Sequence, residues 1–224
     1  MAVRDGERYI RHALETVFGQ TRPPDEVIVV DDGSVDRTRE IAETFPVRVL
    51  PKDPEGVSAA RNLGIAEASG DLIAFIDHDD LWLPRKLERQ VAYLEERPEV
   101  DYVLCRFRVI LEPGASRPVW VRDEYLTQGL MMLCTGALMA RRSTIDAVGP
   151  FATELDMGED ADWLMRAHEA GMTRGVLKEV LFEYRLHHSN AVVRMDPGRA
   201  FLFDLLRRAT ARRAEGAKES RHGV

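Results

Sequence analysis

Three short apolar runs, each followed by a segment with helical spacing, dominate the first half of this chain. They cover residues 26–31, 47–50 and 72–76, and they lack the alternation that marks a strand with one solvated face. Unbroken runs of this kind are typical of parallel strands that are covered on both faces. With the helical segments between them, they predict repeated strand–helix units over residues 26–97. The pattern favours an α/β fold with a mixed, mostly parallel sheet, right-handed crossovers and flanking helices.

The beginning of the chain departs from this pattern. Residues 6–19 carry apolar side chains at helical spacing, but no full strand precedes them. A doubly wound sheet normally begins with a strand whose carboxyl end lies at the ligand crevice. We therefore expect the first strand to be missing, because either the chain is shortened or the sheet has one strand fewer. Only residues 2–4 could represent its end.

The second half is less regular. A helix is predicted over residues 160–170, where Gly171 ends it. We expect one domain over residues 1–198, with a first half over about 1–100 and a second over about 101–198. Further strands are predicted over residues 101–110, 134–140 and 176–184.

The composition excludes several classes of protein. Lys and Arg number 31 and Asp and Glu number 38, which gives a formal net charge of −7. An acidic chain without a dominant basic block is a poor candidate for binding nucleic acid. No uncharged apolar stretch reaches the roughly 18 residues of a transmembrane helix, and the first residues lack the apolar core of a secretory signal. Cys105 and Cys134 make no metal-type spacing and suit a reducing compartment, so we expect a cytoplasmic protein.

Residues 199–224 are expected to form a C-terminal helix and a basic tail. An apolar stretch over 201–206 precedes a segment with several Arg and Lys residues among few acids. Such a segment can lie on an anionic membrane surface, which would bring the protein to the inner face of the membrane. The alternative is an ordinary docked helix with a solvated end.

Two acidic clusters follow predicted strands. Asp31 and Asp32 end the run over 26–31, and Asp77, Asp79 and Asp80 follow the run over 72–76. The carboxyl ends of parallel strands open into one crevice, so these clusters are expected to converge. Carboxylates at one point repel each other unless a cation or a donor intervenes, and Mg²⁺ or Mn²⁺ shared with substrate phosphates would satisfy them. The alternative is that these acids only cap turns and helices.

A third acidic cluster, Glu159-Asp160-Ala161-Asp162, opens the helix predicted near 160, where acids also suit the helix dipole. Arg61 lies in the first turns of a predicted helix after Gly56, which is a plausible anion site. Other basic or titratable groups with a possible ligand role are Arg141, Arg142, Arg185, His187 and His188.

Four motifs in order resemble those of the family 2 glycosyltransferases. They are Asp31-Asp32-Gly33-Ser34, Gly56 to Asn62, Asp77-His78-Asp79-Asp80 and Glu159-Asp160. Segments 134–139 and 184–187 also resemble the family, so the similarity covers about residues 3–190. The resemblance implies the GT-A fold and a nucleotide-diphosphate sugar as donor. The chain has neither the Gln-x-x-Arg-Trp element nor the membrane segments of polysaccharide synthases, which favours transfer of one sugar. The resemblance further implies a hexosyltransferase of cell-envelope or polysaccharide biosynthesis.

The resemblance also implies roles on the donor side. Asp32 matches the acid that binds the nucleobase, commonly uracil, so a UDP-linked donor is expected. Arg61 matches a position that touches the diphosphate, and His187 matches a histidine that reaches the diphosphate or the metal. Asp77 and Asp79 match the D-x-D element, with Asp79 as the direct ligand of Mn²⁺ or Mg²⁺ and Asp77 on the ribose or the metal.

On the acceptor side, Asp160 matches the catalytic base. A carboxylate there would take the proton of the attacking hydroxyl in one displacement, with inversion at the anomeric carbon. The cation would neutralise the departing nucleoside diphosphate. Glu159 and Trp163 are possible acceptor-side residues, Trp163 either as an apolar platform for a sugar or as a core side chain.

Two other functions stay open. One is a sugar nucleotidyltransferase, or a phosphotransferase that uses Asp77 as nucleophile. The other is a nucleotide-sugar binding protein that lost activity with its first strand. Neither the acceptor (a saccharide, a lipid-linked or a small molecule) nor the oligomeric state has a readable motif.

Overall fold

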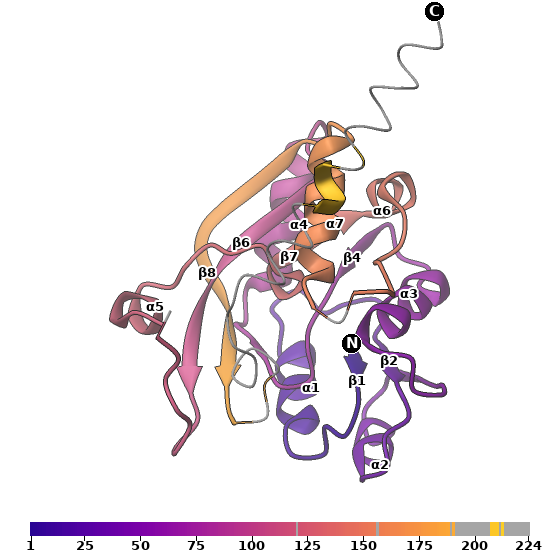
Figure 1. Cartoon of the computed structure of the whole chain (residues 1–224), viewed down its shortest axis with the longest axis vertical. Helices are drawn as coiled ribbons and strands as arrows, with labels where there is room; N and C mark the ends of the chain where they lie inside the picture. Colours follow the sequence, from indigo (N-terminus) through magenta and orange to yellow (C-terminus); the bar gives the residue numbers. More distant parts are fainter. Residues whose placement is uncertain (120, 156, 189, 191–206, 211, 213–224) are drawn as a thin grey trace, which may run out of the picture.

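The structure is a computed structural model, and it describes residues 1–119, 121–155, 157–188, 190, 207–210 and 212. Figure 1 shows its helices and strands. The α/β class that the sequence predicts is present, but the strands form two sheets instead of one.

The first sheet is fully parallel. It contains β1 (Ala2–Val3), β2 (Ile28–Asp31) and β3 (Arg48–Pro51) in that order. Ala2 pairs with Val30, so the prediction that the first strand is missing is wrong: two residues suffice to add it to the edge of β2. The ladder continues beyond the strand, because Asp32 donates its N–H to the carbonyl of Val3 over 2.8 Å.

The second sheet is mixed, with the order β4-β7-β6-β8-β5. The long strands β6 and β8 pair in parallel, and β7 lies antiparallel to both β4 and β6. The predicted third parallel strand, β4, therefore belongs to this sheet rather than to the first. A predominantly parallel arrangement holds only for the first sheet. The bounds are β4 (Leu72–Ala74), β5 (Leu81–Trp82), β6 (Tyr102–Leu111), β7 (Leu138–Arg141) and β8 (Arg174–Leu186).

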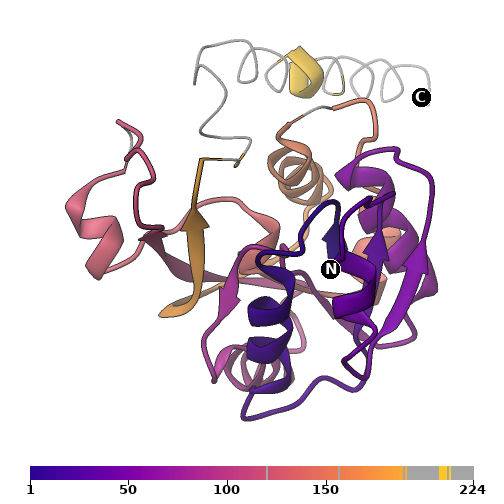
Figure 2. The same ribbon diagram turned by 90° about the horizontal axis from the view of Figure 1, so that it is seen from below.

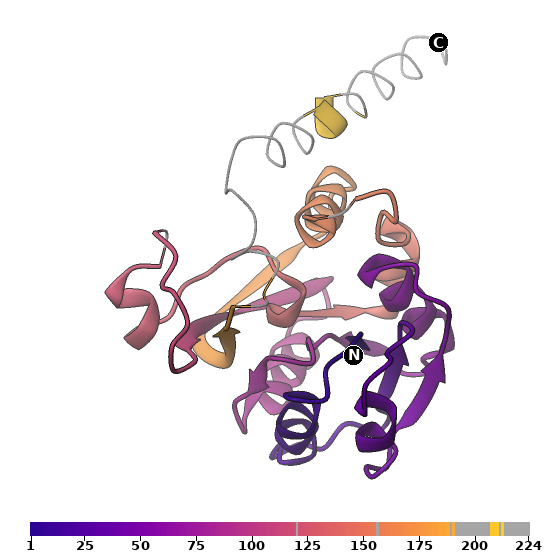
Figure 3. The ribbon, with the colours of Figure 1, turned by 60° about the horizontal axis from the view of Figure 1, so that its bottom comes forward.

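The helices cover both sides of the sheets. Figures 2 and 3 show α1 and α4 on one side and α7 on the other. The sequence explains α1, because Ile10, Leu14 and Val17 fall on one face and are buried there. The bounds are α1 (Ile10–Phe18), α2 (Thr38–Ala42), α3 (Val57–Glu67), α4 (Lys86–Glu96), α5 (Asp123–Thr127), α6 (Arg142–Val148) and α7 (Glu159–Glu169), with a 3₁₀ turn, η1 (Thr135–Ala137).

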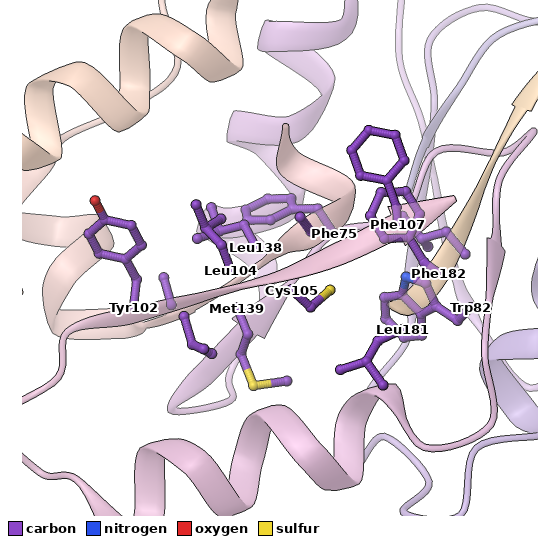
Figure 4. Packing of buried hydrophobic residues seen from close by; sticks show 14 of the residues in the cluster. Phe75, Trp82, Tyr102, Leu104, Cys105, Phe107, Leu138, Met139, Leu181 and Phe182 are labelled. Carbon is purple, nitrogen blue, oxygen red and sulfur yellow. The ribbon is translucent and has the colours of Figure 1, made fainter. Parts of the chain in front are cut away.

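The main hydrophobic core lies around β6 and β7. Side chains pack on both sides of β6, as Figure 4 shows. Leu138 and Met139 are neighbours on β7 and point to opposite faces, as successive strand residues do, so both faces are filled. Cys105 is buried in this core, and it and Cys134 are free thiols.

A cavity of about 460 Å³ lies at the seam between the two sheets. Ile28 and Val30 of β2, together with Ile73 of β4, belong to its lining. Neither Asp79 nor Asp160 lines it, but Arg61, which belongs to the acidic site described below, does.

The C-terminal segment is described only in part. Residues 207–210 are helical, and Arg208 binds Glu154 at 2.8 Å while Arg212 binds Asp162 at 2.9 Å. Most of the predicted basic tail, and with it the predicted membrane contact, lies outside the described residues. No helix in the described ranges combines the length and the apolar character needed to cross a membrane.

Candidate functional site

The acidic turn between β4 and β5 carries three carboxylates in four residues. Asp79 is almost buried, and its Oδ2 lies 2.9 Å from His187 Nε2 and accepts a hydrogen bond of 3.1 Å from Asn190 Nδ2. Burial alone would raise the pKa of Asp79, but the contact with His187 and the nearby His78 outweigh it and hold that pKa below its usual value. Asp79 is therefore an ionised carboxylate inside the protein.

Asp80 behaves in the opposite way. Burial and the charges of Asp79 and Asp77 raise its pKa well above the usual range, although its Oδ1 accepts the N–H of Arg185 over 3.0 Å. Asp80 is 2% exposed. The pKa values of these two neighbouring acids are thus shifted in opposite directions, down for Asp79 and up for Asp80.

Arg61 joins the acidic turn to the N-terminus of α7. Its Nη2 donates to Asp77 Oδ1 over 2.9 Å, and its Nη1 donates to Glu159 Oε1 over 2.6 Å. The guanidinium is 7% exposed, and both terminal nitrogens are bound to carboxylates. Arg61 therefore bridges two acidic clusters in this structure, and its predicted contact with a diphosphate stays a prediction.

Asn62 adds to this connection. Its side-chain amide donates to the carbonyl of Phe151 over 2.9 Å and accepts the N–H of Phe151 over 2.8 Å. Because Arg61 and Asn62 both lie on α3, this helix fixes the chain that leads into α7. Helix α3 thus contacts both the acidic turn and the segment that leads into α7.

Asp160 lies in the first turn of α7. Gly158 caps this helix with φ of 80°, a conformation that favours glycine, so the chain turns sharply into the helix. Burial and the neighbouring Glu159 raise the pKa of Asp160 to about 6, although Arg61 opposes them. A carboxylate with such a pKa is a suitable general base near neutral pH.

Asp31 and Asp32 organise the turn after β2 and the loop after β3. Asp31 accepts two hydrogen bonds from Arg39 and one from the N–H of Ser34. Asp32 binds Lys52 Nζ at 2.8 Å and accepts the N–H groups of residues 55 and 56. Burial would raise the pKa of Asp32, but these donors lower it. Asp32 is 4% exposed and holds the loop before α3, so its predicted contact with a nucleobase stays a prediction.

The structure does not support the expected acceptor-side roles of Trp163 and Glu159. Trp163 is fully buried, and its Nε1 donates to the carbonyl of Gly149 over 2.9 Å, so its ring is a core side chain and not a platform for a sugar. Glu159 is 8% exposed and bound to Arg61, so it does not face an acceptor in this structure.

Arg141 and Arg142 are also engaged elsewhere. Arg141 donates to the carbonyls of Leu94 and Val100, and Arg142 donates to those of Ala68 and Gly70. They stabilise the C-terminal ends of α3 and α4 and the segments that follow them, and these contacts do not involve the acids of the site.

The sequence analysis missed two residues of the site, Tyr9 and Asn190. The ring of Tyr9 stacks on that of His187, with centroids 4.5 Å apart and planes at 25°. Asn190 binds Asp79 and also accepts the N–H of His187 through Oδ1. Neither residue belongs to a motif. Tyr9 lies near the start of a predicted helix and Asn190 follows His187, and these positions are the only signal that the sequence offers.

The acidic turn fits a cation that is shared with a substrate. In the described part of the chain, no group of three His, Cys, Asp or Glu side chains is arranged to hold a metal ion. Among those same residues, Asp79 engages its donors through Oδ2 and Asp77 through Oδ1, which leaves one oxygen of each carboxylate for a cation. Mg²⁺ and Mn²⁺ commonly take few protein oxygens and complete their shell with water and phosphates.

The fold matches solved structures of glycosyltransferases. S. aureus TarS 1–349 in complex with UDP-GlcNAc superposes with a TM-score of 0.76 over 94% of this chain and 64% of that one, at 21% identity. The mannosyltransferase PcManGT from Pyrobaculum calidifontis, in complex with GDP-Man and Mn²⁺, gives a TM-score of 0.63 over 84% of this chain and 56% of that one, at 23% identity. The structure therefore has the GT-A fold that the sequence implied.

The sequence matches point to the same family. EpsH of Bacillus subtilis is 32% identical over 214 residues, which are 87% of this chain and 62% of EpsH. This chain thus spans less than two thirds of the length of that relative. The model of the family described as glycosyl transferase family 2 matches residues 1–150. Since that match covers more than half of the sequence, the chain belongs to glycosyl transferase family 2.

Proposed function

We propose that this protein transfers one hexose from a nucleoside diphosphate sugar, expected to be UDP-linked, to an acceptor hydroxyl with inversion. One observation carries the proposal: Arg61 holds Asp77 and Glu159 on one guanidinium. It supports a common site for the acidic turn and for Asp160, which directly follows Glu159. Relatives with the same fold have been solved with UDP-GlcNAc and with GDP-Man and Mn²⁺.

Asp160 is the proposed general base. An acceptor hydroxyl must lose its proton as it attacks the anomeric carbon, and the raised pKa of Asp160, about 6, matches that task. A base opposite the leaving group favours a single displacement. Inversion of the anomeric configuration follows from that geometry.

Asp79 is the proposed ligand of a divalent cation, with Asp77 beside it. The bound cation would supply charge neutralisation for the departing nucleoside diphosphate. Asp79 is ionised, and His187 and Asn190 orient it through Oδ2, so its Oδ1 is the oxygen proposed to bind the cation. His187 is proposed to lie next to the same cation or the diphosphate.

The two alternatives have less support. The binding-protein hypothesis was based on a missing first strand, and β1 is present. An Asp77 nucleophile is disfavoured because the ion pair with Arg61 at 2.9 Å stabilises the negative charge of the carboxylate and lowers its nucleophilicity. A covalent phosphate on Asp77 would revive that hypothesis.

Thermal unfolding in the presence of candidate donors tests the proposal. UDP-, GDP- and dTDP-sugars are added with and without Mn²⁺, because a ligand that binds the native state raises the apparent stability. We expect at least one donor to raise the Tm only when Mn²⁺ is present, and Asp79→Asn to abolish that increase. Asp71→Asn, an exposed acid that directly precedes β4, is the matched control and keeps the increase. A chain that no nucleotide sugar stabilises under any of these conditions contradicts the proposal.

A further inference from the structure

The segment between β1 and α1 lies against the acidic turn. A Cβ placed on Gly6 would come within 2.6 Å of His78 Cδ2, so the imidazole of His78 packs directly on the backbone there. Three residues later, the ring of Tyr9 stacks on that of His187. The segment therefore contacts the histidine that precedes Asp79 in sequence and the histidine that binds Asp79 in space.

Tyr9 is fixed at its far end. Its hydroxyl donates to Glu112 Oε2 over 3.0 Å, while Arg8 Nη2 binds Glu112 Oε1 at 2.8 Å. Glu112 in turn donates its backbone N–H to the carbonyl of Leu186 over 2.9 Å, next to His187. Burial and Glu112 raise the pKa of Tyr9, so the phenol stays a neutral donor. These contacts prevent the ring from rotating away from His187.

Tyr9 touches two groups that hold Asp79. His187 contacts the side chain of Asp79 through Nε2. Arg185 donates through Nε to the backbone carbonyl of Asp79 over 2.8 Å, and its guanidinium carbon lies 5.2 Å from the centroid of the Tyr9 ring. One aromatic ring thus contacts His187, which binds the Asp79 carboxylate, and Arg185, which binds the Asp79 backbone.

We propose that Tyr9 is a positioning residue of the transferase site: its ring sets the plane of His187 and the place of Arg185, and thereby orients the Asp79 carboxylate toward a divalent cation. This inference rests on the proposed role of Asp79. It adds Tyr9, which belongs to no motif, to the proposed site. An aromatic contact of this kind is strong enough to change a binding constant by up to about tenfold.

The test compares three variants. Tyr9→Leu removes the stacked ring, Tyr9→Phe keeps the ring but loses the hydroxyl, and Phe18→Leu is the matched control. Phe18 is an aromatic residue at the other end of α1, where it stacks on Phe45 with centroids 6.0 Å apart. Each variant is measured by titration with Mn²⁺ in the presence of UDP, followed by electron paramagnetic resonance, which requires no turnover.

We expect Tyr9→Leu to weaken Mn²⁺ binding about tenfold, Tyr9→Phe to stay close to the wild type, and Phe18→Leu to lower the Tm without changing the Mn²⁺ affinity. Proton–carbon spectra of the metal-free protein give a second readout. The ring protons of His187, assigned by their loss in His187→Gln, shift in Tyr9→Leu because the ring current is removed, and keep their position in Phe18→Leu.

The inference is overturned if Tyr9→Leu and Phe18→Leu affect Mn²⁺ binding equally, or if the His187 resonances are unchanged in Tyr9→Leu. A wild type that does not bind Mn²⁺ at all overturns it as well. A wild type that binds Mn²⁺ with the expected differences, but transfers sugar from none of the donors, supports the positioning role while the proposed function fails.

Discussion

Arg61 and Glu159 are 98 positions apart in the sequence, and Arg61 Nη1 lies 2.6 Å from Glu159 Oε1. This contact holds the start of α7, and with it Asp160, beside the acidic turn. It also makes Arg61 essential to the fold, because two carboxylates would otherwise be left close together in a largely buried place.

Arg61→Met removes both ion pairs and keeps an apolar stem that can still pack near Phe151. We expect it to lower the free energy of unfolding by about 3 kcal/mol, since the nearly buried Glu159 and the partly exposed Asp77 lose their counter-ion. Chemical denaturation measures this difference. Arg85→Met is the matched control, because Arg85 binds Glu88 on the surface and such pairs contribute little. Equal stabilities of the two variants would show that the Arg61 bridge does not hold the site together.

Asp160→Asn should separate binding from chemistry. Without a base, we expect kcat to fall by about 10²- to 10⁴-fold while the Kd of the donor changes little. Asp162→Asn provides the control on the same helix. Asp162 is buried and binds Arg166 and Arg212, so this variant should lose stability but keep its turnover. If Asp160→Asn turns over at the wild-type rate, Asp160 is not the base.

The pKa of Asp160, about 6, also predicts a pH profile. The base is active only when ionised, so kcat should fall about tenfold per pH unit below that value and level off above it. A profile that is flat between about pH 5 and 8 would contradict this assignment.

The same shift has a consequence for stability. The pKa of Asp160 is higher in the folded chain than its ordinary value of 3.8, so the folded protein binds the proton more tightly. The stability that this proton confers is complete below about pH 4 and is lost as the pH rises to about 6. We therefore expect Asp160→Asn to be more stable than the wild type above pH 6, by about 1 kcal/mol, and no more stable at pH 4. Thermal unfolding at both pH values measures this; a variant that is less stable at high pH would contradict the raised pKa.

Lys86 gives a prediction outside the site. It is fully buried, donates to Gln90 Oε1 over 2.7 Å and lies 4.5 Å from the centroid of the Trp82 ring. Burial lowers the pKa of Lys86 from 10.5 to about 8, so the folded protein binds this proton more weakly than the unfolded chain does. The wild type should therefore gain stability relative to Lys86→Met as the pH rises from about 8 to 10. A difference in Tm that stays constant over this range would show that the buried amine does not titrate there.

Much of this site could be predicted from the sequence, because its acids follow strands or begin a helix. The sequence predicted that Asp79 follows a strand and that Asp160 begins a helix, and the structure brings their segments together through Arg61, while the roles of both acids stay predictions. The ion pair between Arg61 and Glu159 could not be predicted, because it depends on how α7 packs after a long and irregular segment. The antiparallel pairing of β4 with β7 could not be predicted either, because the sequence of a buried apolar strand does not show the direction of its neighbour.

The aromatic residues show the same limit. Trp163 lies one turn after Asp160, and this spacing alone does not say whether its ring faces the site or the core. The contacts with Gly149 and Phe151 decide for the core. Tyr9 shows the opposite. Its position at a helix start gives no sign of a role in the site, yet its ring stacks on that of His187.

The configuration of the sugar that is first released tests the account most directly. The protein is incubated with an α-linked nucleotide sugar and Mn²⁺, water serves as the acceptor, and proton NMR follows the anomeric signal before the sugar equilibrates. A single displacement with Asp160 as base predicts that the β-anomer appears first. Early release of the α-anomer would contradict the single displacement and, with it, the role that we assign to Asp160.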